Sequence, residues 1–165
     1  KMNLDNLKFE IDNIKLKTKE LKSLVTKFNK IIIIGNGGSN AIASHISVDY
    51  TKFLKIPTMS FTSSPMITAY NNDYGVEKSY EQFLMDFATS NTLIILISSS
   101  GNSMNIINAA KYCEENNIMY AGLSGFNSNN KLNNMNANFK YHVNYDSYGL
   151  VEISHEILLH SIVKN

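Results

Sequence analysis

A dense group of hydroxyl side chains is the feature of this sequence that most directly indicates chemistry. Four serines follow the apolar run 93–97, and they are Ser98, Ser99, Ser100 and Ser103. Such a stretch predicts a buried strand, a turn and the start of a helix, where free N–H groups and the helix dipole favour an anion. The alternative is a turn whose hydroxyls only cap the helix. Because the hydroxyls are so dense directly after a buried strand, we predict a cup for a phosphate monoester.

A glycine-rich turn at residues 35–39 (GNGGS) follows four consecutive isoleucines in the same way. Its glycines allow a ligand to approach the backbone closely, and Asn36 and Ser39 offer side-chain hydrogen bonds. The turn lacks the spacing of a dinucleotide fingerprint and the lysine of a nucleoside triphosphatase loop, which disfavours a nucleotide. Alone it is equally typical of a plain strand-to-helix turn capped by Ser39. Together the two turns predict a phosphorylated small molecule as ligand.

Histidines and carboxylates recur at helical spacing in two places. His45 and Asp49 are four residues apart, and Glu152, Glu156 and His160 repeat that spacing near the end of the chain. If two helices present these stripes to each other, imidazole and carboxylate groups surround one point, which suits a divalent metal such as zinc. Each pair alone is also typical of a solvated or capping pair, so the hypothesis requires that the helices meet.

The elements that must position these groups alternate along the chain. Residues 3–28 have the apolar spacing of an amphipathic helix. Strands are expected at 31–34, 58–61, 93–97, 119–123 and 139–143. Helices are expected near 39–54, 64–71, 76–88, 104–117 and 150–163. This alternation predicts an α/β fold with a doubly wound, five-stranded parallel sheet that has helices on both faces and binds ligands beyond the carboxyl ends of its strands.

Length and charge restrict the classes of protein that this chain can represent. Its 165 residues predict a single domain, 1–165, in which residues 1–28 serve packing or oligomerisation. The net charge is +1 and every basic residue is lysine, so a phosphate must be held mainly by N–H groups and hydroxyls. Acidic residues interrupt the lysines between Lys8 and Lys30, which argues against a nucleic-acid surface.

Three further residues lie outside these motifs. A lone cysteine, Cys113, cannot form an internal disulfide, and no apolar run is long enough to cross a bilayer. With no leader-like segment either, we expect a cytoplasmic protein that does not bind membranes. His142 and His155 fit no group of potential ligands, so we expect them to be surface or structural residues.

These motifs together resemble those of the sugar isomerase (SIS) domain family. They are the glycine turn with His45, the segment 71–75 (NNDYG), the serine stretch 97–103 (ISSSGNS) and the segment 152–160. The resemblance extends from Lys30 almost to the end and is strongest to the phosphoheptose isomerases, which convert sedoheptulose 7-phosphate to a D-glycero-D-manno-heptose 7-phosphate. It implies a flavodoxin-like fold and a homo-oligomer, dimer or tetramer, with sites where subunits meet. The pathway it implies is heptose supply for lipopolysaccharide or capsule.

The resemblance also implies a role for each motif. The serines at positions 98, 99, 100 and 103 would hold the sugar phosphate, while Asn36, Ser39 and Asp73 would contact the open-chain sugar. A zinc ion would be bound by His45, Asp49, Glu152 and His160. Of these ligands, Asp49 would act as the base and His160 as the acid of an isomerisation through an enediol.

Two of the implied zinc ligands depart from the family pattern. Asp49 stands where the family has glutamate, and Glu152 where it has glutamine. A base that is shorter by one methylene is displaced by roughly 1 Å, which can cost on the order of a hundredfold in rate. The sequence therefore leaves three hypotheses, namely a heptose phosphate isomerase, an isomerase of another sugar phosphate and a catalytically silent sugar-phosphate-binding module.

Overall fold

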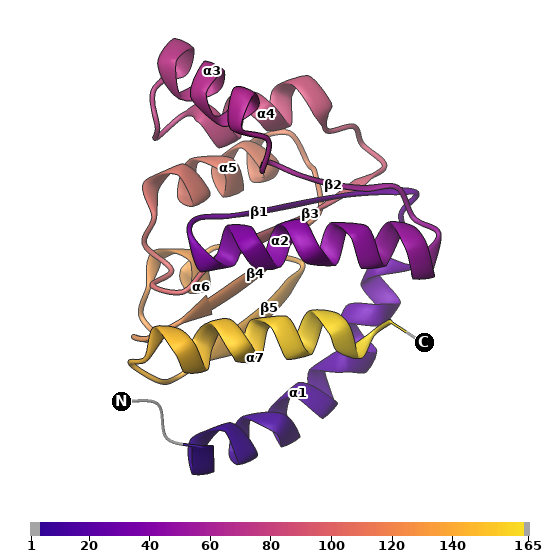
Figure 1. Cartoon of the computed structure of the whole chain (residues 1–165), viewed down its shortest axis with the longest axis vertical. Coiled ribbons are helices and arrows are strands. Elements are labelled where there is room, and N and C mark those ends of the chain that lie inside the picture. The colour runs from indigo at the N-terminus through magenta and orange to yellow at the C-terminus, as the bar shows by residue number, and fades with distance from the viewer. Residues whose placement is uncertain (1–3, 164–165) are drawn as a thin grey trace.

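The computed structural model describes residues 4–163, and its centre is a sheet of five parallel strands (Figure 1). The strands are β1 (Lys30–Gly35), β2 (Thr58–Ser60), β3 (Thr92–Ser98), β4 (Tyr120–Gly125) and β5 (Phe139–Val143). Their order in the sheet is β2-β1-β3-β4-β5. The predicted doubly wound parallel sheet is confirmed. The first three and last two residues of the predicted domain, and with them the predicted helix start at residue 3, lie outside the described residues.

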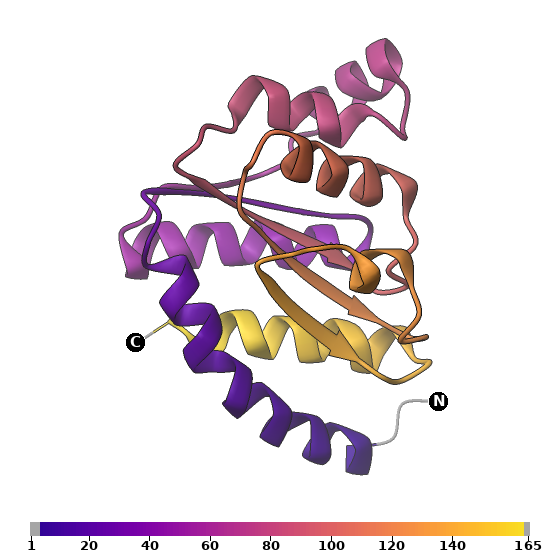
Figure 2. The same cartoon turned by 180° about the vertical axis from the view of Figure 1, so that it is seen from behind.

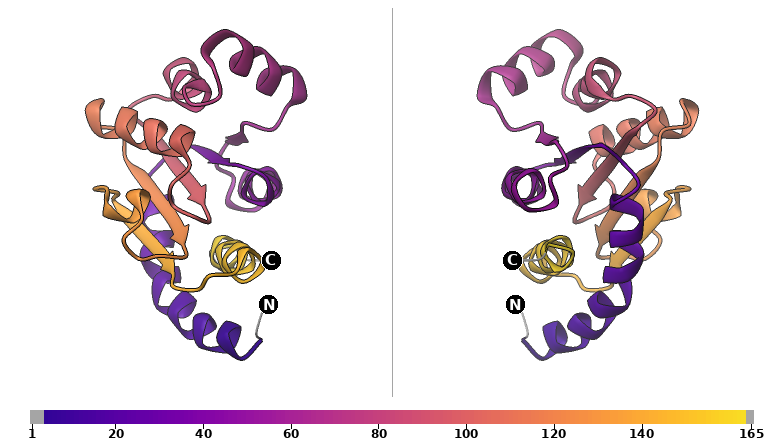
Figure 3. Two further views of the ribbon diagram at one scale, coloured as in Figure 1. Left: turned by 90° about the vertical axis from the view of Figure 1, so that its left-hand side faces the viewer. Right: turned by 90° about the vertical axis from the view of Figure 1, so that its right-hand side faces the viewer.

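Helices cover both faces of this sheet (Figures 2 and 3). They are α1 (Leu4–Val25), α2 (Gly38–Asp49), the π-helix η1 (Tyr50–Leu54), α3 (Ser64–Tyr74), α4 (Ser79–Phe87), α5 (Met104–Glu115), α6 (Lys131–Asn134) and α7 (Tyr148–Ser161). One face packs against α1, α2 and α7, and the other against α4, α5 and α6, with α3 lying outside α4. None of the helices in the described range 4–163 is long and apolar enough to cross a membrane.

The run of four isoleucines in β1 shows why the sheet is covered on both sides. Successive side chains of a strand point to opposite faces. Ile31 and Ile33 belong to the apolar cluster under α1, α2 and α7, whereas Ile32 and Ile34 belong to the cluster under α4 and α5. All four are fully buried. A continuous apolar run therefore becomes a central parallel strand rather than a half-exposed one.

The second predicted helix differs from the structure at its end. The sequence predicts one helix over 39–54, but α2 ends at Asp49 and the chain continues as the π-helix η1. This segment ends at Lys55, whose φ of 61° is left-handed. Apolar spacing does not distinguish a π-turn from an α-turn, because the apolar residues continue through the junction. Single π-turns of this kind are frequent at functional sites.

The strand order places the two predicted anion-binding turns beside each other. The order reverses at β1, between β2 and β3, and ligands of open α/β sheets bind at such a switch point. Gly35 at the end of β1 is in register with Ile97 near the end of β3. The glycine turn, residues 35–39, and the serine loop, residues 98–103, therefore leave the sheet side by side.

Candidate functional site

A cavity of about 390 Å³ opens between the glycine turn and the serine loop. Its lining residues are Asn36, Gly37, Gly38, Ser39, Ile97, Ser98, Ser99, Ser100, Ser103, Tyr148 and Glu152. All four serines predicted to hold a phosphate are thus brought to one cavity, together with Ser39. None of these lining residues is a lysine, so the cavity offers hydroxyls and N–H groups rather than cationic side chains.

The serine loop leaves hydroxyl groups available for a ligand. Ser103 is the N-cap residue of α5, yet its side chain caps no N–H group of the helix. Its hydroxyl instead accepts a long hydrogen bond of 3.3 Å from Ser98 Oγ. The hydroxyl of Ser99 is buried and has no hydrogen-bond partner within residues 4–163. This arrangement favours the phosphate cup over the alternative of a helix-capping turn, because a buried hydroxyl without a partner is unfavourable unless a ligand or water pairs with it.

The glycine turn also differs from a side-chain-capped helix start. The N-cap of α2 is Gly37, with φ 53° and ψ −122°, and not Ser39. A residue with a side chain rarely adopts this conformation, so the glycine allows the chain to turn sharply into α2. The first N–H groups of α2 therefore face the cavity without a side-chain cap, and they provide partial positive charge there.

Asn36 joins the glycine turn to α5 and α4. Its Nδ2 donates to Asn105 Oδ1 at 3.0 Å, and its Oδ1 accepts from Asn105 Nδ2 at 3.0 Å and from the Tyr80 hydroxyl at 2.8 Å. The amide of Asn36 is paired with these neighbours while Asn36 also lines the cavity, and its expected contact with the sugar stays a prediction. Asn105 and Tyr80 are positioning residues that the sequence did not reveal, since asparagine is frequent throughout the chain.

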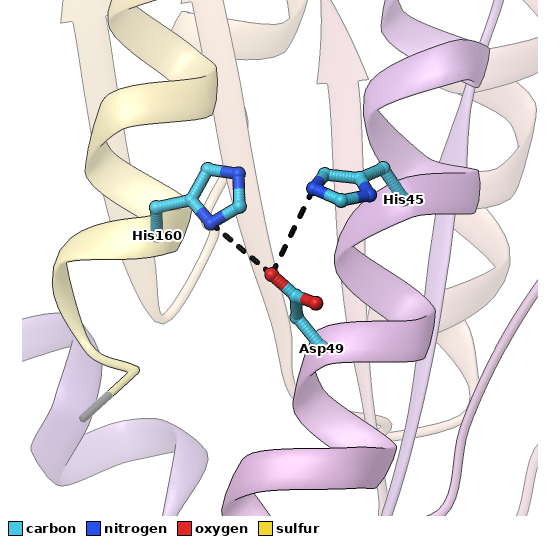
Figure 4. A group of neighbouring side chains, drawn as sticks. All are labelled: His45, Asp49 and His160. Carbon is cyan, nitrogen blue, oxygen red and sulfur yellow. Dashed lines mark ion pairs between the residues drawn. The ribbon is translucent and has the colours of Figure 1, made fainter. Parts of the chain in front are cut away.

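Helices α2 and α7 run side by side in the same direction (Figures 1 and 3). A second group of polar side chains lies near the carboxyl-terminal ends of these two helices. His45, Asp49 and His160 bring one donor atom each to within 4.8 Å of one another (Figure 4). Asp49 Oδ2 lies 3.3 Å from His160 Nδ1 and 3.8 Å from His45 Nε2. The required meeting of the two helices is thus present, and we call these three residues the His/Asp cluster.

The donor atoms of this cluster fit a divalent metal. Nitrogen and oxygen ligands at about 2.0–2.1 Å from a tetrahedral zinc ion are roughly 3.4 Å apart. The separations of 3.3 and 3.8 Å around Asp49 Oδ2 are close to that value. Asp49 is largely buried, with a side-chain exposure of 17%, whereas His45 and His160 are more open. A metal in this cluster is therefore partly shielded but still accessible from solvent.

A buried tyrosine at the π-helix junction holds the cluster together. The hydroxyl of Tyr50 donates to the main-chain oxygen of Leu159 at 3.0 Å, and both groups are buried. These residues directly neighbour Asp49 and His160 in the chain. Burial raises the pKa of Tyr50, so this donor stays protonated. The π-turn that brings Tyr50 into this position was not visible in the apolar pattern.

A family model describes most of this architecture. The model of the SIS domain matches residues 4–125, which include the glycine turn and the serine loop. The chain belongs to the SIS domain family.

Two curated relatives of this SIS domain are phosphoheptose isomerases. The phosphoheptose isomerase of Fusobacterium nucleatum is 31% identical over 150 residues, which are 88% of this chain and 76% of the relative. The phosphoheptose isomerase of Aneurinibacillus thermoaerophilus is 38% identical over 103 residues, which are 59% of this chain and 52% of the relative. The second match thus spans only about half the length of that relative.

A solved structure shows the same fold. The phosphoheptose isomerase GmhA from Neisseria gonorrhoeae superposes with a TM-score of 0.88 over 96% of this chain and 89% of that chain. Its sequence identity to this chain is 23%. The likeness confirms the expected SIS fold, with the amino-terminal helix included.

Glu152 does not join the His/Asp cluster of this SIS domain. Its carboxylate lies against the first residue of α2, because a Cβ on Gly38 would be only 2.6 Å from its carboxylate atoms. Glu156 lies between Glu152 and His160 on α7, with its Oε1 3.9 Å from His160 Nε2. A groove between α2 and α7 is lined by both glutamates. Glu152 therefore lies at the serine-loop end of this groove, whereas His160 does not line the groove and follows Glu156 by four residues on α7.

Asp73 is not brought to the serine loop either. It lies exposed near the end of α3, where its Oδ1 accepts a hydrogen bond from Asn72 Nδ2 at 2.9 Å. Asn71, two residues earlier, does line a neighbouring cavity, which also contains Asn36 and Tyr80. Within the described single chain, a contact of Asp73 with the sugar stays a prediction.

The remaining histidines, which were expected to be surface or structural residues, make hydrogen bonds within the fold. His155 is fully buried and its Nε2 lies 3.0 Å from the main-chain oxygen of Ser124, while burial lowers its pKa to about 4. His142 pairs through Nδ1 with the Ser124 hydroxyl at 3.0 Å, and burial lowers its pKa as well. Cys113 is buried and its pKa is raised to about 12, so it is a poor nucleophile.

Proposed function

We propose that this SIS domain is an aldose–ketose isomerase that acts on sedoheptulose 7-phosphate. The observation that carries the proposal is that the same two helices, α2 and α7, hold a hydroxyl-lined cavity near their starts and the His/Asp cluster near their ends. A phosphate in the serine loop anchors one end of an open-chain sugar, and the cluster lies where the other end reaches. The names of the curated relatives support this reading.

The distance between the cavity and the His/Asp cluster supports a long sugar. Gly38 at the cavity and His45 in the cluster are seven residues apart on α2, which corresponds to about 10 Å along a helix axis. An extended chain advances about 3.5 Å for three bonds. The phosphorus and C1 of a heptulose 7-phosphate are therefore roughly 9 Å apart when extended, whereas in a triose phosphate they are only about 5 Å apart. A seven-carbon substrate thus matches the distance between the cavity and the His/Asp cluster along α2.

The chemistry assigned to the cluster is proton transfer between adjacent carbons. Asp49 removes a proton from C1 of the ketose and returns it to C2, through an enediol that forms and collapses. His160 donates a proton to the carbonyl oxygen at C2, and the hydroxyl at C1 returns a proton to His160 as the aldehyde forms. No net proton or electron is gained or lost. Asp49 is well placed for this role because its carboxylate is largely buried beside His160.

A zinc ion would be held by His45, Asp49 and His160, the three donors that fit it. Such an ion acts as a Lewis acid that polarises the substrate carbonyl. Glu152, the fourth ligand implied by the family resemblance, would have to turn away from Gly38 to join them.

A specific observation also favours the silent binding module. Asp49 is one methylene shorter than the glutamate of the family, and Glu152 lies outside the cluster. A module of this kind retains the serine loop and binds sugar phosphates but does not turn them over. Turnover therefore separates the two candidates, whereas binding does not.

We also propose a cytoplasmic homo-oligomer with sites at subunit contacts. Phe9 and Leu16 are 73% and 78% exposed on the outer side of α1, an area that supports association with a second copy. The single buried thiol of Cys113 is typical of a reducing compartment. Light scattering on the purified chain gives the oligomeric state directly.

The test of the proposed function is a comparison of substrates of different length. Zinc-loaded protein is incubated with sedoheptulose 7-phosphate, fructose 6-phosphate and ribulose 5-phosphate, and aldose formation is followed by NMR. We expect the largest kcat/KM for the seven-carbon ketose. Faster turnover of ribulose 5-phosphate would overturn the substrate assignment. Binding of all three without turnover would establish the silent module.

A further inference from the structure

The carboxylate of Glu152 forms part of the wall of the cavity that we assign to a phosphate. It lies directly over Gly38, where a Cβ would approach its carboxylate atoms to 2.6 Å, and it shares the cavity with the serine loop. Within residues 4–163 no hydrogen bond or ion pair to this carboxylate is found. The negative charge of Glu152 therefore lies, without a cationic partner, at the cavity where we propose that a phosphate binds.

This placement opposes phosphate binding in the absence of a cation. Like charges a few ångströms apart repel strongly when water is partly excluded. Glu152 also lies at the positive end of α2, the same end that would attract the phosphate. The residues that line the cavity and the adjoining groove include no lysine, and the chain has no arginine. No basic side chain lining the cavity or the groove offsets the charge of Glu152.

The His/Asp cluster is where a cation could supply the missing positive charge. It lies on the same two helices as Gly38 and Glu152, and Glu156, which lines the groove beside Glu152, has its Oε1 3.9 Å from His160 Nε2. Glu152 is only partly buried, and its side chain has the rotatable bonds needed to turn along the groove. A divalent cation in the cluster attracts this carboxylate and lowers its repulsion of an anion in the serine loop.

We infer that Glu152 couples the His/Asp cluster to the serine loop, so that a divalent cation in the cluster tightens the binding of a phosphate monoester in the loop. The inference rests on the proposed phosphate site but not on turnover. Because Glu152 replaces the neutral glutamine of the family pattern, this coupling is a property of this chain. Coupling is reciprocal, so the phosphate tightens cation binding by the same factor.

The test measures binding and not activity. The affinity for methyl phosphate is determined by calorimetry for the full chain, with and without saturating zinc, in the wild type, Glu152→Gln and the matched control Glu156→Gln. Glu156 lies one helical turn further along the groove and does not line the phosphate cavity. Thermal unfolding shows whether each variant is folded, and Glu152→Ala replaces Glu152→Gln if the latter is not.

For the wild type we expect zinc to tighten methyl phosphate binding about tenfold or more, which corresponds to ~1.4 kcal/mol. In Glu152→Gln the metal-free affinity rises to near the zinc-loaded wild-type value, and the zinc effect falls to about twofold or less. Glu156→Gln keeps most of the wild-type effect.

Three results would overturn the inference in distinguishable ways. An equal zinc effect in the wild type and in Glu152→Gln would refute the coupling and leave the phosphate site intact. No binding of methyl phosphate to any variant, with or without zinc, would refute the phosphate site and the coupling together. Isomerase activity without any coupling would refute the inference but support the proposed function.

Discussion

Gly101 is the residue of the serine loop for which the effect of replacement on the free energy of unfolding can be calculated most directly. Its φ is 65°, and a Cβ at this position would lie 1.9 Å from Oδ1 and 2.1 Å from Cγ of Asn130. Asn130 is almost fully buried, with 1% exposure. The Gly101→Ala variant must therefore adopt an unfavourable backbone conformation and also displace Asn130.

The loss of stability expected for Gly101→Ala can be worked out from the hydrogen bonds of Asn130. Its Nδ2 donates to the main-chain oxygens of Asn127 and Gly125 at 2.8 and 3.2 Å, and its Oδ1 accepts from the N–H of Asn133 at 2.8 Å. At ~1 kcal/mol each, these three bonds contribute about 3 kcal/mol. The left-handed conformation of a residue with a side chain adds about 1–2 kcal/mol. We expect Gly101→Ala to lower the free energy of unfolding by about 4–5 kcal/mol.

Gly75 offers a matched control for the backbone effect alone. Its φ is 77°, and no atom lies within 4 Å of a Cβ placed there. Gly75→Ala should therefore lower the free energy of unfolding only by the ~1–3 kcal/mol of a backbone conformation, φ 77° and ψ 155°, that is essentially restricted to glycine. Both variants are compared with the wild type by urea unfolding at neutral pH. If the two variants are destabilised equally within about 1 kcal/mol, the packing of Asn130 against the serine loop does not stabilise the fold as we argue.

Three further predictions concern the cluster and the buried histidine. Asp49→Asn and His160→Ala should each lower kcat for the heptulose phosphate by about 10²–10⁴, with unchanged unfolding curves; normal turnover in either would contradict its role. Zinc should raise the melting temperature of the wild type but not that of His45→Ala, as measured by calorimetry; equal shifts would place the metal elsewhere. Burial lowers the pKa of His155 from about 6.5 to about 4, so the unfolded chain binds the extra proton between these pH values. The contribution of neutral, buried His155 to the free energy of unfolding is complete above about pH 6.5. The free energy of unfolding falls by up to ~3 kcal/mol toward pH 4. Urea unfolding at the two pH values should show a smaller loss for His155→Gln, and an equal loss would contradict the burial argument.

The sheet could be predicted because continuous apolar runs in the sequence indicate strands that are buried on both faces. The apolar run 93–97 and the four isoleucines of β1 must be covered on both faces, which only a parallel sheet between helices provides. The predicted strand positions agree with the structure to within about two residues. In contrast, α6 is a single turn and η1 is a π-turn, and neither leaves a periodic apolar signal.

The site could be predicted where the spacing of two residues along one helix determines the side of the helix on which both side chains lie. The four-residue spacing of His45 and Asp49 places both on one side of α2, and their meeting with His160 needed only that α7 lie alongside. Glu152 could not be placed in this way. Its carboxylate occupies the space left by the missing side chain of Gly38, a contact between distant parts of the chain.

The pairing of Asn36 with Asn105 was hidden for a similar reason. A side-chain amide after a strand can contact a ligand or another amide, and the sequence does not distinguish the two. The second partner comes from α5, and it is one asparagine among many in the chain. Only the register of β1 against β3 brings the two amides together.

Proton exchange at the reacting carbons is the most direct test of the claim that the serine loop and the His/Asp cluster form one isomerase site. Zinc-loaded protein is incubated with sedoheptulose 7-phosphate in D2O, and NMR follows deuterium at C1 of the ketose and at C2 of the aldose. The account predicts deuterium at both carbons for the wild type, and none for Asp49→Asn, which still binds methyl phosphate. Undiminished exchange in Asp49→Asn, or no exchange in a wild type that binds the sugar phosphate, would contradict it.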